Sequence, residues 1–221
     1  MKNIWKKILI VWILILSIVT GFFLYREHSY IATVMIDPGH GGYDVGAIGY
    51  DQETYEKDLT LEIGKQIGKQ IKKINPKIKV VFTRTDDTVD WPSEERADLQ
   101  YRVQMAQKKD ADFYLSIHMN ASDNTQASGY SFHIREDDAL SNAIAESMNT
   151  QFEKANWSNS RGIVYTSTQP LYVVDHLDHA MLLETGFITN PSELHKLKSY
   201  FNQRKIAKAV ALAICENITE D

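Results

Sequence analysis

An uncharged run from Ile8 to Tyr25, rich in Ile, Leu, Val and Phe, is the feature that most limits how this chain can fold. Its length is close to the roughly 20 residues that an α-helix needs to cross a bilayer. It exceeds the ~7–15-residue apolar core of a cleavable signal sequence. We therefore expect residues 1–29 to hold one transmembrane signal-anchor helix and residues 30–221 to form a single domain. A buried core helix and a cleaved signal, which would give a secreted protein, are the alternatives.

The charges around this run predict its orientation. Lys2, Lys6 and Lys7 precede it, and lysines next to a membrane span favour the cytoplasmic side. The domain that follows is therefore expected outside the membrane. The net charge of −5 argues against a nucleic-acid partner, because nucleic-acid-binding domains are typically basic. Cys215 is the only cysteine, which excludes an intrachain disulfide and a cysteine-rich metal site.

Short apolar segments alternate with amphipathic ones after residue 30. Leu59, Ile63, Ile67 and Ile71 recur at helical spacing, and Pro76 follows them. The expected strands are Ala32–Ile36, Ile78–Phe82, Asp112–Ile117, Gly129–Ile134 and Ala180–Leu183. The expected helices are 59–74, 93–109, 138–154, one that starts near Asn190, and 201–218. The segment 161–170 is expected to be loop-like with a short extended piece. This alternation predicts an α/β layered domain with a mostly parallel, mixed sheet flanked by helices.

Four polar residues occupy special places in this pattern. His40, His118 and Glu184 each follow a predicted strand, and Glu56 lies where the first helix of the domain begins. The carboxyl edge of a parallel sheet is where ligands bind in such folds, so these four side chains are expected to meet there.

Their chemistry is that of a hydrolytic zinc site. His40, Glu56 and His118 would supply the three protein ligands of one Zn²⁺, which leaves a position for water. Glu184 would then be the general base that takes and returns a proton. Each residue also has a structural interpretation. His40 would be a turn histidine, and Glu56 a helix-start glutamate that favours the helix dipole. His118 would be a core histidine, and Glu184 a paired buried carboxylate.

Three other histidines are weaker candidates. His133 lies in a predicted strand and is expected at the surface. His176 and His179 flank Asp178, but no helix is predicted there to place them on one face. A structural role is therefore favoured for all three.

Five segments in a fixed order resemble a known family. They are IDPGHGG, EKDLTL, ADFYLSIHMNA, SGYSF and LLETGFITNP. Together they are similar to the zinc-dependent N-acetylmuramoyl-L-alanine amidases of type 3, bacterial peptidoglycan hydrolases. The resemblance runs from about Ala32 to the C-terminus.

The resemblance implies a phosphorylase/hydrolase-like α/β fold with a single zinc ion. Motif by motif, the family's ligands fall on His40, Glu56 and His118, and its catalytic glutamate falls on Glu184. The substrate would be peptidoglycan, cleaved at the amide between the lactyl group of N-acetylmuramic acid and L-alanine. A zinc peptidase that cuts the stem peptide, and an inactive wall-binding module, remain as alternatives.

Overall fold

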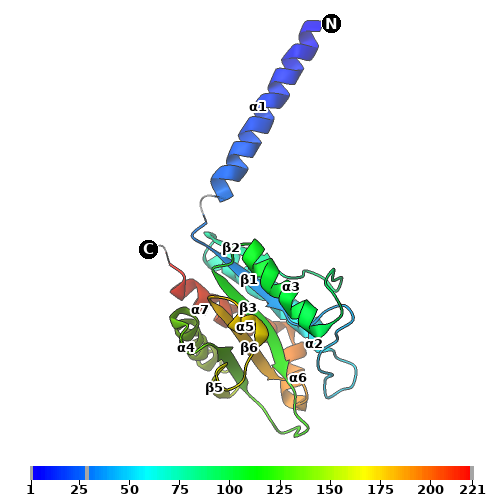
Figure 1. Cartoon of the computed structure of the whole chain (residues 1–221), viewed down its shortest axis with the longest axis vertical. Helices are drawn as coiled ribbons and strands as arrows, with labels where there is room; N and C mark the ends of the chain where they lie inside the picture. The colour runs from blue at the N-terminus through cyan, green and yellow to red at the C-terminus, as the bar shows by residue number, and fades with distance from the viewer. Residues whose placement is uncertain (1, 28–29, 220–221) are drawn as a thin grey trace. The chain divides into compact units, whose positions relative to one another are not determined.

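The structure, a computed structural model, describes residues 2–27 and 30–219 and contains two compact units (Figure 1). The first unit, Met1–Ile31, is helix α1 (Lys2–Glu27). Residues Ile4–Phe22 of α1 are long and apolar enough to cross a membrane, and their side chains are exposed. A continuous apolar run satisfies its backbone hydrogen bonds internally only as a helix, which is the form a bilayer requires.

The second unit, Ala32–Asp221, is built on a six-stranded sheet with the order β2-β1-β3-β6-β4-β5. The strands are β1 (Ala32–Pro38), β2 (Ile78–Phe82), β3 (Phe113–Asn120), β4 (Tyr130–Ile134), β5 (Ser160–Tyr165) and β6 (Ala180–Phe187). Neighbouring strands run parallel except β4 and β6, which pair antiparallel. The predicted α/β fold with a mostly parallel, mixed sheet is confirmed.

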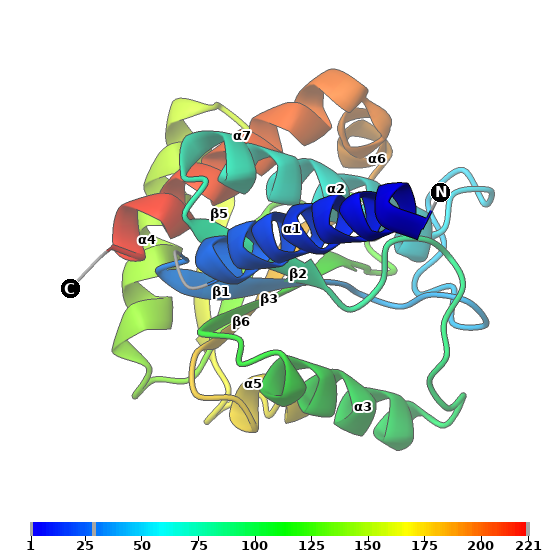
Figure 2. The ribbon, with the colours of Figure 1, turned by 90° about the horizontal axis from the view of Figure 1, so that it is seen from above.

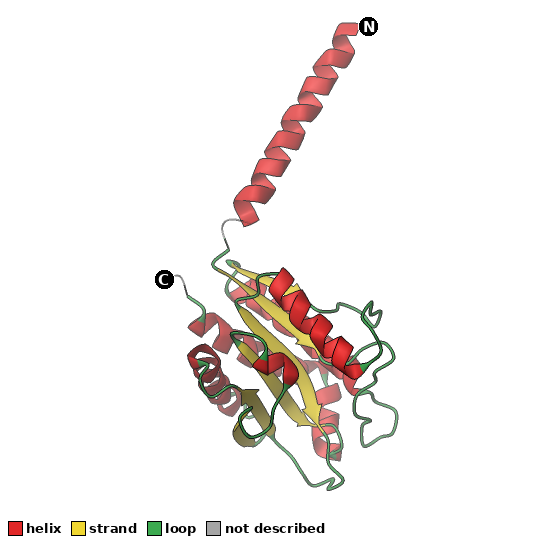
Figure 3. Ribbon diagram, in the orientation of Figure 1, coloured by secondary structure: helices red, strands yellow, loops and turns green. Residues whose placement is uncertain are grey.

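Helices cover both faces of this sheet (Figure 3). They are α2 (Glu56–Ile74), α3 (Glu95–Lys108), α4 (Ala139–Lys154), α5 (Tyr172–Asp175), α6 (Pro191–Lys198) and α7 (Tyr200–Asn217). Figure 2 shows α2, α4, α6 and α7 on one side of the sheet and α3 and α5 on the other.

The alternation of side chains along each strand decides which face they bury. On one face, Phe132 of β4 stacks on Phe152 of α4 with ring centroids 6.3 Å apart. On the other face, Met35 of β1 and Tyr114 of β3 pack with Val103 of α3. Both faces are therefore apolar layers, as an α/β sandwich requires.

Strands β3 and β6 extend further than predicted, and this changes where two site residues lie. β3 continues to Asn120 because Asn120 pairs with Phe187 of β6 after a register shift. His118 and Glu184 therefore lie within β3 and β6 instead of just past them, and they are direct neighbours in the parallel ladder.

One other prediction was incomplete. The segment 161–170, expected to be loop-like with a short extended piece, begins within the edge strand β5, which pairs with β4. The two predicted C-terminal helices are confirmed, and Ser199, with an extended backbone, lies between α6 and α7.

Candidate metal centre and active site

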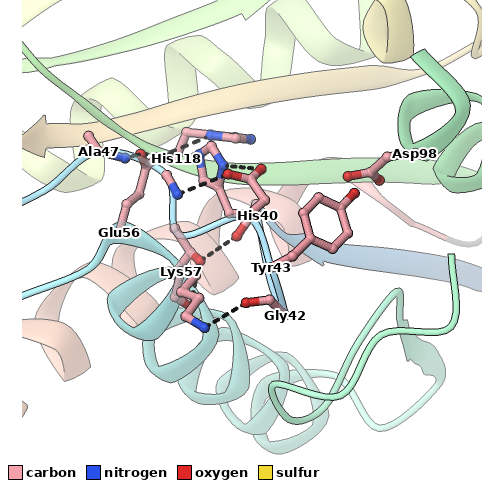
Figure 4. A network of polar contacts seen from close by, with 12 residues as sticks. His40, Gly42, Tyr43, Ala47, Glu56, Lys57, Asp98 and His118 are labelled. Atoms are coloured by element: carbon pink, nitrogen blue, oxygen red, sulfur yellow. Dashed lines mark hydrogen bonds and ion pairs between the residues drawn. The ribbon is translucent and has the colours of Figure 1, made fainter. Parts of the chain in front are cut away.

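Three segments bring a nitrogen or oxygen ligand to one point at the carboxyl edge of β1 and β3. His40 comes from the loop after β1, Glu56 is the first residue of α2, and His118 lies near the end of β3. One ligand atom from each side chain lies within 4.8 Å of the others. Figure 4 shows the three side chains pointing toward one another.

Glu56 is the best-connected member of this cluster and is buried. Its Oε1 accepts the N–H of Met119 at 2.8 Å and lies 3.1 Å from His118 Nδ1. Its Oε2 accepts the N–H of Ala47 at 2.9 Å and lies 3.1 Å from His40 Nε2. Burial alone would raise the pKa of Glu56, but the contacts with His118 and His40 outweigh it and hold this pKa far below its ordinary value.

His40 is oriented by a second carboxylate. Its Nδ1 lies 2.7 Å from Asp44 Oδ2, so its Nε2 is the nitrogen that faces Glu56. Burial alone would lower the pKa of His40, but Glu56 and Asp44 raise it to about 9. A ligand histidine commonly has such a carboxylate partner, which fixes the ring and its tautomer. Sequence reasoning missed Asp44, because a four-residue spacing has no fixed geometry in a glycine-rich loop.

The glycines of this loop make room for the ligands. A Cβ on Gly46 would lie 2.6 Å from the His40 ring and 2.8 Å from Glu56, and its φ of +67° disfavours other residues. A Cβ on Gly39 would lie 2.4 Å from the His118 ring. The loop can therefore close on the cluster only because these positions lack side chains.

Glu184 lies beside the cluster on β6. It is the parallel neighbour of His118 and the antiparallel neighbour of Ser131. Its Oε2 is buried and has no hydrogen-bond partner among the residues that the structure describes. Burial raises the pKa of Glu184 to about 7. A buried polar atom without a partner is rare in folded proteins and is often explained by function.

The donor set of the cluster is one that zinc accepts, two imidazoles and one carboxylate. Glu56 Oε2 lies 3.1 Å from His40 Nε2 and Glu56 Oε1 lies 3.1 Å from His118 Nδ1, while ligand atoms around a tetrahedral zinc ion lie roughly 3.4 Å apart. Within the described part of the chain, no other such group of three ligands is found. His176 Nδ1 lies instead 2.7 Å from the Tyr172 carbonyl, and His179 Nδ1 lies 2.7 Å from Asp138.

A cleft of about 610 Å³ opens beside His40 and His118 on the α3 and α5 face of the sheet. Residues of α3 form one wall, and Leu171–Val174 form the other. Tyr43 stands at the cleft and donates its hydroxyl to the Pro92 carbonyl at 2.8 Å. Such a space can hold one arm of a substrate whose reacting group lies at the cluster.

A network of hydrogen bonds around Arg102 holds the loop after β1 that carries His40. Arg102 of α3 donates to Asp37 and to Asp98, both at 2.6 Å, and to the His40 carbonyl at 3.2 Å. Burial alone would raise the pKa of Asp37, but Arg102 and the hydroxyls of Thr83 and Ser116 lower it to about 2. No sequence signal marked Arg102, because its helix shows no motif that would distinguish this residue from a surface arginine.

One sequence expectation about this region was wrong. His133 is buried, with an exposed fraction of 7%, and its Nδ1 has no hydrogen-bond partner among the described residues. Its strand neighbours on β6 and β5 are Leu182 and Val164, which flank it on both sides.

Comparisons with known proteins identify relatives of this chain. The amidase LytC of Bacillus subtilis is 34% identical over 182 residues, which is 80% of this chain and 34% of LytC. The chain thus spans about a third of the length of that relative.

Two solved structures share the fold over most of this chain. The catalytic domain of the amidase CwlV from Bacillus (Paenibacillus) polymyxa has 32% identity and a TM-score of 0.75, with 86% of this chain and 99% of that one covered. The CwlD amidase of Clostridioides difficile, solved with the GerS lipoprotein, has 26% identity and a TM-score of 0.77, with 86% and 100% covered. The profile of the Amidase_3 family, described as N-acetylmuramoyl-L-alanine amidase, matches residues 34–216. The chain belongs to this family.

Proposed function

We propose that this protein hydrolyses peptidoglycan at the amide bond between the lactyl group of N-acetylmuramic acid and L-alanine. His40, Glu56 and His118 would hold one zinc ion, and Glu184 would be the general base. The observation that carries the proposal is the meeting of three ligand atoms within 4.8 Å beside Glu184, whose Oε2 is buried and has no hydrogen-bond partner among the described residues. Family membership supports the choice of substrate.

The chain's own residues account for the proton transfers. When bound, a zinc ion supplies Lewis-acid chemistry, which polarises a carbonyl and lowers the pKa of water. Glu184 accepts a proton from the attacking water while the water oxygen adds to the lactyl carbonyl carbon. Glu184 then returns that proton to the nitrogen of L-alanine as the C–N bond breaks. The products are a lactyl carboxylic acid and a stem peptide with a free amino terminus.

The surroundings of Glu184 suit this role. A general acid and base works best when its pKa lies near the working pH, and burial raises the pKa of Glu184 to about 7. Its Oε2 has no hydrogen-bond partner among the described residues, so none of these bonds has to break before it accepts the proton. The cleft between α3 and α5 can orient one arm of the substrate next to the cluster.

The test is a digestion of purified sacculi by the full-length protein in detergent, followed by mass spectrometry of the products. We expect free stem peptides that begin with L-alanine. Release should stop when a chelator removes the zinc and in the Glu184→Ala variant. Stem fragments cut at internal peptide bonds would instead identify a zinc peptidase. A wild-type protein that binds zinc but releases nothing would indicate an inactive wall-binding module.

We also propose that α1 anchors the enzyme in the membrane with residues 30–221 outside. The apolar segment Ile4–Phe22 and the lysines at positions 2, 6 and 7 support this arrangement. Membrane fractions washed at alkaline pH should retain the full-length chain, and external protease should digest its catalytic domain. A shortened protein in the medium would show cleavage and secretion instead.

A further inference from the structure

Arg84 is a buried arginine that the proposed mechanism does not use. It lies two residues after β2, and its side chain is almost fully enclosed. Its guanidinium donates to four backbone carbonyls and one hydroxyl: those of Pro38, Asp86, Gly39, Lys57 and Thr60. Burial lowers the pKa of this arginine, so the fold keeps a charge here at a cost in desolvation. Such a group calls for an explanation beyond core packing.

The carbonyls that Arg84 holds belong to the two segments that carry His40 and Glu56. Nε donates to Pro38 at 3.0 Å and Nη2 donates to Gly39 at 3.0 Å, and these residues directly precede His40. Nη2 also donates at 2.7 Å to the carbonyl of Lys57, the residue after Glu56. One guanidinium therefore links the loop after β1 to the start of α2.

The hydrogen bonds of Arg84 hold a segment whose backbone conformation is unfavourable without such contacts. His40 has a φ of +63°, a conformation that residues with a side chain rarely adopt. Surrounding contacts must hold it there, and the Pro38, Gly39 and His40 carbonyls are all fixed by arginines. Arg102 reaches only the His40 loop and is paired with Asp37 and Asp98, whereas Arg84 reaches both segments.

We propose that Arg84 is a positioning residue of the metal centre, which sets zinc affinity by fixing the separation of His40 and Glu56 without touching the ion. The inference rests on the metal centre of the proposed function. The planar fork of arginine can hold several carbonyls in one fixed geometry, which the single ammonium of lysine cannot. Thr60 assists, because its hydroxyl donates to the Gly39 carbonyl at 2.9 Å.

The experiment measures zinc affinity in full-length Arg84→Lys by competition with a chromophoric chelator, without substrate and well below the unfolding temperature. Loss of residues that orient metal ligands typically weakens metal binding by ~10–100-fold. We expect a weakening in that range. The unfolding midpoint of the metal-free protein is measured separately, because a purely structural role would change that midpoint and leave the affinity of the folded protein unaltered.

Arg135→Lys is the matched control. Arg135 also donates to two backbone carbonyls, those of Leu177 and Asp178, but these lie outside the ligand-bearing segments. The zinc affinity of the Arg135→Lys variant should equal that of the wild type. Equal weakening in Arg135→Lys and Arg84→Lys would overturn the proposal.

Thr60→Val is the second test if Arg84→Lys does not fold. It removes the hydroxyl that accepts from Arg84 and donates to the Gly39 and Lys57 carbonyls, and it keeps the side-chain shape, so a weakening of a few fold is expected. Zinc affinity within twofold of the wild type in every folded variant at these two positions would refute the inference. An inactive wild type with normal zinc binding would count against the proposed function alone.

Discussion

Glu56 and Glu184 lie at the same edge of the sheet, and their surroundings differ sharply. Each oxygen of Glu56 accepts a backbone N–H and faces a histidine nitrogen at 3.1 Å. The Oε2 of Glu184 has no hydrogen-bond partner among the described residues. The pKa of Glu56 is accordingly held far below its ordinary value, whereas burial raises that of Glu184 to about 7.

The surroundings of the two glutamates, not their residue type, therefore separate the two roles that we propose for them. A carboxylate that is fully hydrogen-bonded stays ionised and is suited to hold a cation. A carboxylate that is buried without partners can gain and lose a proton near neutral pH. Separate positions, one at the start of α2 and one on β6, allow one small site to contain both kinds.

The largest expected effect comes from Glu184→Gln, which keeps the shape of the side chain and removes its ability to accept a proton. General acid–base catalysis contributes ~10²–10⁴-fold, so kcat on sacculi should fall by about that factor. Zinc affinity should stay within about twofold of the wild type. A variant that keeps more than a tenth of the wild-type kcat would show that Glu184 is not the base.

Glu56→Gln should have the opposite effect to Glu184→Gln. It should weaken zinc binding, and activity should fall because the zinc is lost. The new amide NH₂ would meet the N–H of either Ala47 or Met119, donor against donor, and the charge that attracts the ion would be gone. We expect zinc affinity to fall by more than about 100-fold, beyond the usual effect of losing an outer partner.

The matched control for Glu56→Gln is Glu193→Gln. Glu193 is also buried and accepts backbone N–H groups, from Gly129 and Phe187, but it is not a member of the ligand cluster. It should lower the unfolding midpoint and leave zinc affinity of the folded protein unchanged. If both variants lost zinc equally, the comparison between Glu56 and Glu184 would fail.

The sequence was sufficient to predict where this site lies but not the residues that orient its side chains. Strand ends and a helix start can be read from periodicity, and parallel strands bring their ends to one edge, so His40, His118, Glu56 and Glu184 could be expected together. The contact between Asp44 and His40 could not be predicted, because it depends on a loop whose path is set by glycines with positive φ.

Buried polar residues were the hardest to predict. Arg84 follows a strand just as His40 does, and that position was its only signal in the sequence. His133 alternates with apolar neighbours, which is the pattern of a solvent-facing position, yet it is buried. The cause is tertiary: His133 is flanked in the sheet by Leu182 of β6 and Val164 of β5, two residues distant from it in sequence.

Asp37 offers a further way to sharpen the comparison, because it is a third buried carboxylate at this edge and has a lowered pKa without belonging to the ligand cluster. A folded-state pKa of about 2, against 3.8, means that the native state holds the ionised form more strongly than the unfolded chain. Its stabilisation is complete above about pH 5 and is lost as the pH falls toward 2.

Urea unfolding of the metal-free protein between pH 7 and pH 2.5 should reveal this contribution. The stability difference between wild type and Asp37→Asn should shrink by roughly 2 kcal/mol across that range. A difference that is independent of pH would mean that Arg102 does not stabilise the charge of Asp37. Asp37 combines a lowered pKa with a position outside the ligand cluster, so a lowered pKa does not by itself identify a carboxylate as a metal ligand.

The smallest effect is expected at Asp44, and it decides whether the ligand carboxylate has been identified correctly. Asp44 Oδ2 lies 2.7 Å from His40 Nδ1, but its side chain is 40% exposed, so water screens the interaction. Asp44→Ala should therefore weaken zinc binding by about tenfold, the low end for an outer partner. Asp44→Asn should weaken it less, because the amide oxygen can still accept the hydrogen bond from Nδ1. If Asp44→Ala cost as much affinity as Glu56→Gln, Asp44 would be a ligand itself, and the contrast between Glu56 and Glu184 would no longer describe the division between metal binding and catalysis.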